Sequence, residues 1–267
     1  MKPRETWGTP REAKRLDIKN ITDARLTLSA PGQAVDTATA LTFALDHARA
    51  REAVLSEFDL KELRATLSRL GFEHRTVTSA AEARDTYIRR PDLGRVLPQA
   101  TSDELSAIAP CDVALVLGDG LSASAAMLNG PAFFAALAAR LAARGLNVGP
   151  VIVARQARVA LGDGIATALD AQTVVMALGE RPGLSAADSL GVYITHKPHP
   201  GTADSERNCI SNVREAGLSI EAAAEQAEHL IMAMRRTGQS GVALSSSLAV
   251  SAGAGALASS QDDDLAG

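Results

Sequence analysis

A charged turn, Gly179-Glu-Arg-Pro-Gly-Leu184, directly follows the continuous apolar run from Val174 to Leu178. Apolar runs of this kind predict strands that are buried on both faces of a parallel sheet. Open α/β sheets bind ligands at the edge where such strands end. Glu180 would then be held by the turn as an acceptor for a ligand. A surface loop with a local ion pair between Glu180 and Arg181 explains the same pattern equally well.

A second polar segment, Asp204-Ser-Glu-Arg-Asn-Cys-Ile-Ser-Asn212, contains one of the two cysteines of the chain. As a nucleophile, Cys209 would need a neighbouring histidine, and this segment has none. A cysteine packed as a small apolar side chain is the more common outcome. We therefore expect Cys209 to contact a ligand rather than to form a covalent intermediate.

The turn Gly118-Asp-Gly-Leu-Ser-Ala123 lies between a predicted strand and a predicted helix. Glycines at such a turn allow a phosphate to approach the backbone, and the helix N–H groups can bind it. The pattern is GxGxxA, however, and no clear acidic partner for a ribose follows at the usual spacing. A tight structural turn is therefore the more common explanation, and a nucleotide site remains the alternative.

Metal ligation is suggested only by His196-Lys-Pro-His199. Two histidines are too few for a protein metal site, and Pro198 favours an extended segment over a helix. We predict no metal site. The sequence also contains no convincing acid–base dyad or nucleophilic triad, so we assign no catalytic residue.

The composition of the 267 residues is ordinary for a globular protein, with 46% hydrophobic and 22% charged residues. Aromatic residues make up only 3%, so the core must consist mainly of Ala, Leu, Val and Ile. A net charge of −4 gives no support to nucleic-acid binding. No apolar run approaches the roughly 18 residues of a membrane span, and no signal-peptide core is present. We expect a cytoplasmic protein with no membrane association.

The predicted secondary structure that positions these residues changes in type along the chain at Pro110. Before it, the apolar spacing predicts mostly helices. After it, apolar β-branched runs alternate with Ala- and Leu-rich helical segments. The predicted helices are 37–55, 58–70, 80–90, 122–144, 161–171 and 219–236. The predicted strands are 72–77, 112–117, 148–154, 173–178 and 192–195.

This alternation predicts an α/β fold with a Rossmann-like, doubly wound, mostly parallel sheet and a helical N-terminal region. The cationic stretch from Tyr87 to Arg95 is either a Pro-terminated helix end or a surface for a partner. The expected divisions of the chain are a flexible N-terminal arm at 1–30, a mostly helical region at 31–109, a Rossmann-like domain at 110–244 and a disordered tail at 245–267.

Three motifs together resemble the small subunit of ethanolamine ammonia-lyase. They are Gly179-Glu-Arg-Pro-Gly-Leu-Ser185, Asp188-Ser-Leu-Gly-Val-Tyr193 and Glu206-Arg-Asn-Cys-Ile-Ser-Asn212. They occur in the family's order and at similar spacing, and the resemblance covers roughly residues 20–240. The segments 47–54, 87–95 and 111–122 fit the same family.

The resemblance implies a Rossmann-like domain that holds adenosylcobalamin together with a large TIM-barrel subunit, which carries the substrate site. The family's enzyme converts ethanolamine to acetaldehyde and ammonia by radical chemistry. Carried over by motif, the cofactor contacts are Val159, Glu180 and Cys209. A cofactor that performs the difficult chemistry leaves orientation and exclusion of water to the protein, which agrees with the lack of a catalytic constellation.

The context of the histidines indicates which base would ligate the cobalt of such a cofactor. Some cobalamin enzymes replace that base with a histidine from an Asp-x-His-x-x-Gly motif, and none of the five histidines has this context. We therefore expect base-on binding, with the nucleotide tail in this subunit and the Gly118–Gly120 turn as a candidate contact.

Two alternatives remain: a self-sufficient Rossmann-type nucleotide-binding enzyme and a non-catalytic scaffold subunit. The missing ribose partner counts against the first, and the polar turns at the expected ligand edge count against the second. Whether residues 1–30 direct the complex into a bacterial microcompartment stays open.

Overall fold

The computed structural model describes residues 35, 37–180, 182–183 and 186–247. The predicted arm at 1–30 and all of the predicted tail beyond residue 247 lie outside these residues. The chain divides into two compact units between Thr42 and Phe43. In the first unit, the described residues are Val35 and the first turns of helix α1, and the strands and the other helices belong to the second unit.

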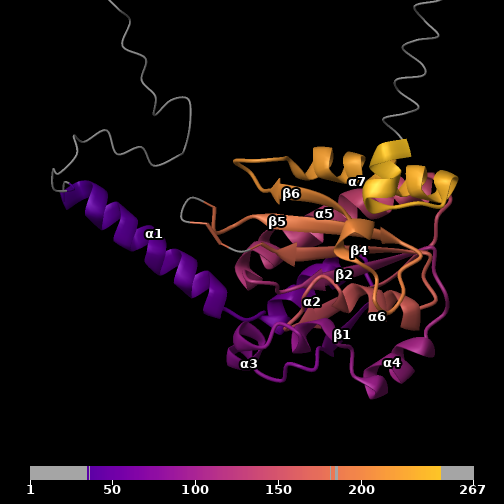
Figure 1. Cartoon of the computed structure of the whole chain (residues 1–267), viewed down its shortest axis with the longest axis horizontal. Coiled ribbons are helices and arrows are strands. Elements are labelled where there is room, and N and C mark those ends of the chain that lie inside the picture. The colour runs from indigo at the N-terminus through magenta and orange to yellow at the C-terminus, as the bar shows by residue number, and fades with distance from the viewer. Residues whose placement is uncertain (1–34, 36, 181, 184–185, 248–267) are drawn as a thin grey trace, which may run out of the picture. The chain divides into compact units, whose positions relative to one another are not determined.

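The second unit is built on a mixed sheet of six strands in the order β1-β3-β2-β4-β5-β6 (Figure 1). The first four in this order run parallel, and β5 and β6 are antiparallel to their neighbours. The strands are β1 (His74–Thr78), β2 (Val113–Gly118), β3 (Val148–Arg155), β4 (Thr173–Gly179), β5 (Leu190–His196) and β6 (Asn208–Val213).

The α/β class is confirmed, but the Rossmann-like, doubly wound description is not, because the sheet is mixed. The strand predicted at 192–195 is present within β5, yet it pairs antiparallel with β4. A parallel strand needs a long crossover connection, usually a helix. The described residues between Gly179 and Leu190 contain no helix, so the chain returns as a hairpin. Residues 208–213, which were not among the predicted strands, form the edge strand β6.

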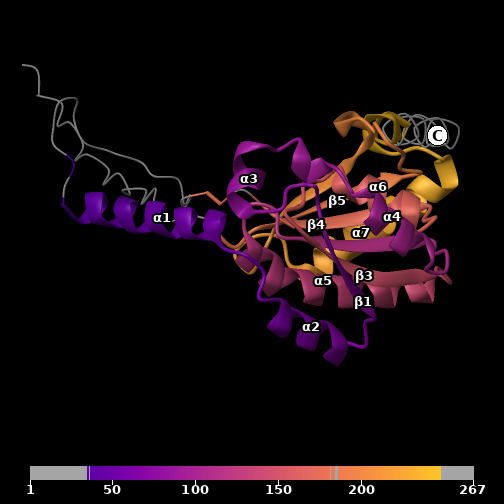
Figure 2. The ribbon, with the colours of Figure 1, turned by 90° about the horizontal axis from the view of Figure 1, so that it is seen from below.

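Helices cover both faces of the sheet, as Figure 2 shows. Helices α2, α5 and α7 share one apolar core with one face, while α4 and α6 share a second core with the other face. The helices are α1 (Thr37–Leu55), α2 (Leu60–Arg69), α3 (Arg84–Arg89), α4 (Gln99–Ser106), α5 (Ala123–Ala143), α6 (Leu161–Ala168) and α7 (Ile220–Thr237), followed by a short helix at 241–247.

Alternation along β2 shows how one strand serves both cores. Leu115 and Leu117 pack with α5 and α7, whereas Ala114 and Val116 pack with α6. All four side chains are completely buried, as expected for a central strand of a sheet covered on both faces. The apolar runs in the sequence therefore result, as predicted, from burial of these strands on both faces of the sheet.

Most of the predicted helices are confirmed within a few residues, and α1 has the predicted bounds. The helix predicted at 80–90 begins only at Arg84. The backbone before it bonds elsewhere: Ala80 N–H donates to Val96 O at 3.0 Å, and the Ser79 hydroxyl donates to Gln156 O at 2.7 Å. Helix α4 was not predicted.

Helix α5 is the one described helix whose length and composition would allow it to cross a membrane. Half of its apolar window is buried inside the protein. Phe133, Phe134 and Leu137 are fully buried in the core that α5 shares with the sheet. A core helix of a globular protein passes the same test, so its composition is weak support for a membrane span.

Candidate functional site

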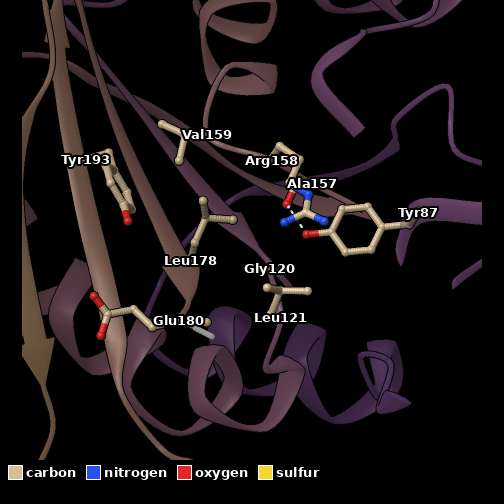
Figure 3. Close-up of a pocket in the computed structure, with 10 residues that line it drawn as sticks. Tyr87, Gly120, Leu121, Ala157, Arg158, Val159, Leu178, Glu180 and Tyr193 are labelled. Atoms are coloured by element: carbon tan, nitrogen blue, oxygen red, sulfur yellow. Dashed lines mark hydrogen bonds between the residues drawn. The ribbon is translucent and has the colours of Figure 1, made fainter. Parts of the chain in front are cut away.

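A pocket of about 410 Å³ lies at the edge where the parallel strands end (Figure 3). In the sheet, β3 and β4 lie on opposite sides of β2. Open α/β sheets bind ligands at the strand ends where the connections run to opposite sides of a strand. Each of these strands contributes the residues that follow it, and α3 and β5 each add a tyrosine. The lining residues are Tyr87, Gly120, Leu121, Ala157, Arg158, Val159, Leu178, Gly179, Glu180 and Tyr193.

Two of the three predicted cofactor contacts line this pocket. Val159 follows β3 and Glu180 follows β4. Cys209 lies on β6 and does not line it, but it pairs in register with Tyr193 of β5, which does. The structure therefore brings Val159 and Glu180 together directly and connects Cys209 to them through Tyr193.

The carboxylate of Glu180 is fixed by the start of the β4–β5 hairpin. Its backbone N–H donates to Ser189 O at 2.9 Å, and the Ser189 hydroxyl donates to its carboxylate. Gly191 leaves room for this arrangement, because a Cβ there would lie 2.9 Å from Oε1 of Glu180. A carboxylate accepts more than one hydrogen bond, so Glu180 retains capacity for a ligand.

Tyr193 lines the pocket and neighbours Cys209, which is exposed on β6. Burial raises the pKa of Tyr193 to about 12, so its hydroxyl stays protonated and can donate. Burial also raises the pKa of the Cys209 thiol, while a hydrogen bond with Tyr193 opposes the rise. A thiol with a raised pKa is a poor nucleophile, which agrees with a contact role for Cys209.

Asp119, in the turn suggested as a nucleotide site, points inward and holds the loop after β3. Its carboxylate accepts the backbone N–H groups of Gln156 at 2.9 Å and Ala157 at 3.0 Å, and it pairs with Arg84 at 3.2 Å. Gln156 has a φ of +52°, a conformation that needs such support. Asp119 thus positions the segment that ends in Val159.

Gly120 of the same turn is required by close packing. Its φ is +53°, and a Cβ there would lie 2.2 Å from Gly179 O. The glycine therefore lets the turns after β2 and β4 meet at the pocket floor. This geometry supports the structural interpretation of the turn, although Gly120 and Leu121 still line the pocket.

Tyr87 and Arg158 form the wall opposite Glu180 and Tyr193, as Figure 3 shows. Tyr87 is completely buried, while Arg89 and Arg90 of the same cationic stretch are exposed. The Tyr87 hydroxyl donates to Ala157 O at 2.9 Å. Burial raises the pKa of Tyr87 to about 12. The Arg158 guanidinium carbon lies 4.4 Å from the centre of the Tyr87 ring.

Sequence reasoning did not single out Tyr87, Arg158, Ser189 or Tyr193 as site residues. One signal was available, because the chain has only two tyrosines and both line this pocket. Because aromatic residues are so scarce in this chain, the two tyrosines beside polar motifs could have been predicted as site residues.

The fold and the pocket define an α/β protein with a candidate ligand site at the edge of its sheet. Among the described lining residues only Glu180 and Arg158 are charged, and the described residues contain no cluster of three metal-ligating side chains. Such a set can orient a ligand by donating and accepting hydrogen bonds.

Comparison with known proteins shows the family to which this chain belongs. The family model described as ethanolamine ammonia-lyase light chain (EutC) matches residues 12–245. A protein of Bradyrhizobium diazoefficiens named ethanolamine ammonia-lyase small subunit is 49% identical over 212 residues, covering 78% of this chain and 81% of its own length.

Two further proteins with the same name are similar over more of the chain. The one from Rhodopseudomonas palustris is 45% identical over 90% of this chain and 92% of its own length. The one from Xanthomonas campestris is 39% identical over 91% and 88%, respectively. The chain therefore belongs to the ethanolamine ammonia-lyase light-chain family.

Proposed function

We propose that this chain is the small subunit of an ethanolamine ammonia-lyase and binds adenosylcobalamin together with a large TIM-barrel subunit. The observation that carries the proposal is the convergence of Val159, Glu180 and Tyr193 on one pocket at the ligand edge of the sheet. The family names support the activity, and the words "small subunit" in the relatives' names imply a larger partner.

The residues of the pocket fit a corrinoid. A corrin ring is fringed with amide side chains, so its host needs acceptors and donors at the rim and apolar contacts at the face. Glu180 supplies a hydrogen-bond acceptor and Tyr193 supplies a hydroxyl. Val159 supplies a small apolar side chain that can contact the face of the ring. When bound, adenosylcobalamin supplies the radical that starts the deamination of ethanolamine to acetaldehyde and ammonia.

The role of this chain is to bind and orient rather than to move protons. Glu180 is held by Ser189, and the loop of Val159 is held by Asp119, so both contacts are fixed before a ligand arrives. Such preorganisation lowers the entropic cost of binding. Cys209 would contact the cofactor from β6, beside Tyr193.

We further propose that the cofactor binds base-on, with its nucleotide tail in this subunit. None of the described residues that line the pocket is a histidine. His196, for example, bonds to Thr173 at 3.0 Å, at the end of β4 opposite Glu180. We place the complex in the cytoplasm, with residues 1–30 as the candidate signal for a microcompartment.

The test is reconstitution with the large subunit. Acetaldehyde release from ethanolamine and adenosylcobalamin is expected only when both chains are present. Turnover by either chain alone, or none by the pair, would contradict the proposal. In the same complex, prepared with ¹⁵N-histidine, the Co(II) paramagnetic resonance signal should retain its nitrogen triplet, whereas a doublet would show that a histidine has replaced the benzimidazole.

A further inference from the structure

Two arginines stack on one tyrosine beside the pocket, but only one of them has an acidic partner. The guanidinium carbons of Arg84 and Arg158 lie 4.8 and 4.4 Å from the centre of the Tyr87 ring. Arg84 pairs with Asp119 at 3.2 Å, and both side chains are almost fully buried. The positive charge of Arg84 is therefore compensated inside the protein.

Arg158 has no such compensation. Its Nε is buried without a hydrogen-bond partner, and no carboxylate of the described residues forms an ion pair with its guanidinium. Burying the Nε donor without a partner is costly, although the residue as a whole is half-buried. An arginine fork has its best partners in carboxylates and phosphates. The side chain lines the pocket, so an anionic group of a ligand can reach it.

The position of Arg158 is fixed in advance. Its backbone N–H donates to Gly94 O at 2.9 Å, and the preceding Ala157 is bonded to both Asp119 and Tyr87. A Cβ on Gly94 would lie 2.9 Å from Cγ of Arg158, so this glycine admits the side chain. The guanidinium is thus a preorganised, uncompensated cation on the wall opposite Glu180.

We propose that Arg158 binds the phosphodiester of the cofactor's nucleotide tail, an inference that rests on the proposed function. The amides of a corrinoid are neutral and suit Glu180 and Tyr193, whereas the phosphodiester is the one anion of the base-on tail. A carboxylate of the partner subunit is the competing occupant. The pocket favours the cofactor, because Arg158 directly precedes Val159, a cofactor contact of the family, and lines the same cavity.

The experiment compares two corrinoids in the complex of both subunits. Adenosylcobalamin has the phosphodiester, and adenosylcobinamide has the same ring and adenosyl group without phosphodiester or nucleotide. For Arg158→Met we expect the Kd of adenosylcobalamin to rise about tenfold to a hundredfold, the loss typical of a charge-assisted hydrogen bond. The Kd of adenosylcobinamide should stay within about a factor of two, inside the scatter of a near-neutral change.

Arg155→Met is the matched control, because Arg155 ends β3 and pairs instead with Glu57 at 3.1 Å. It should change neither affinity. Arg158→Lys keeps the charge but loses the planar fork. It should weaken the binding of adenosylcobalamin less than Arg158→Met does. If Arg158→Met fails to assemble with the large subunit, the Kd values of the two corrinoids are compared in Arg158→Lys instead.

Equal weakening of both corrinoids by the Arg158 variants would make Arg158 a structural residue and overturn the proposal. Unchanged affinity for both corrinoids, or a loss only of affinity for the large subunit, would overturn it as well and would favour a partner carboxylate. These outcomes differ from failure of the proposed function, in which the wild-type complex binds neither corrinoid.

Discussion

At the residue scale, Glu180 is the one carboxylate among the described residues that line the pocket. Replacing Glu180 by Ala removes a carboxylate that Ser189 holds in place. Loss of a charge-assisted hydrogen bond costs about 1.5–3 kcal/mol. The Kd of adenosylcobalamin in the complex should therefore rise about tenfold to a hundredfold, while turnover at saturating cofactor falls much less.

Equilibrium titration of the complex and steady-state assays would separate these two effects. Glu180→Gln keeps the shape and one acceptor and should weaken binding less than the alanine variant. Glu215→Ala, at an exposed glutamate in the turn after β6, is a matched control and should leave the affinity unchanged. Unchanged affinity with a collapse of turnover in Glu180→Ala would show that Glu180 acts in the chemistry instead.

The sequence predicted Glu180 because it directly follows a buried strand, whereas Val159 was named only through the family resemblance. It could not predict Tyr193 and Tyr87, because their approach to the pocket depends on how β5 and α3 pack. Arg158 directly precedes Val159 in the sequence, but its lack of an acidic partner becomes visible only when Arg84 is seen to pair with Asp119. Pairing between distant residues is a property of tertiary structure.

At the element scale, the packing of α7 on α5 includes one nearly buried carboxylate. Glu228 of α7 accepts from Arg140 at 3.0 Å and from Arg144 at 2.7 Å, both on α5 or at its end. The hydrogen bond from Arg144 is the largest cause of a lowered pKa at Glu228. The two arginine side chains are 37% and 52% exposed, so water screens both pairs.

A lowered pKa in the folded state means that the carboxylate of Glu228 stabilises the fold above its unfolded pKa of about 4.3. That stabilisation disappears as the pH falls through the lower, folded pKa. Glu228→Gln should reduce the free energy of unfolding by about 1 kcal/mol at pH 7, and the difference from wild type should shrink below about pH 4.

Urea unfolding at pH 7, 5 and 3.5 would measure this dependence. Glu225→Gln, on the exposed side of the same helix, is the control and should have little effect at any pH. A difference between Glu228→Gln and wild type that stays constant over this range would contradict the assigned role of the ion pairs.

Most helices and the central strands followed from the sequence, whereas helix α4, the direction of β5 and the edge strand β6 did not. The run at 192–195 looks like the central strands because burial, not direction, determines an apolar pattern. In β6 only Ile210 and Val213 are buried, and the register shifts along its pairing with β5. Its residues therefore lack the period of two that indicates a strand.

At the scale of the whole molecule, the pocket is open and incomplete. Its volume of about 410 Å³ suits a small ligand, whereas a corrin ring with its side chains and nucleotide is much larger. Under the proposed function, a second protein surface would therefore enclose the rest of the cofactor, and the small-subunit names of the relatives imply such a partner.

The most direct test is an equilibrium titration of adenosylcobalamin against this chain, the large subunit and their complex, followed by the corrin absorbance. We predict tight binding to the complex, at least about a hundredfold tighter than to either chain alone, because a site shared by two proteins loses most of its contacts when either is absent. Equal affinity of the large subunit with and without this chain would contradict the central claim that this chain forms part of the cofactor site.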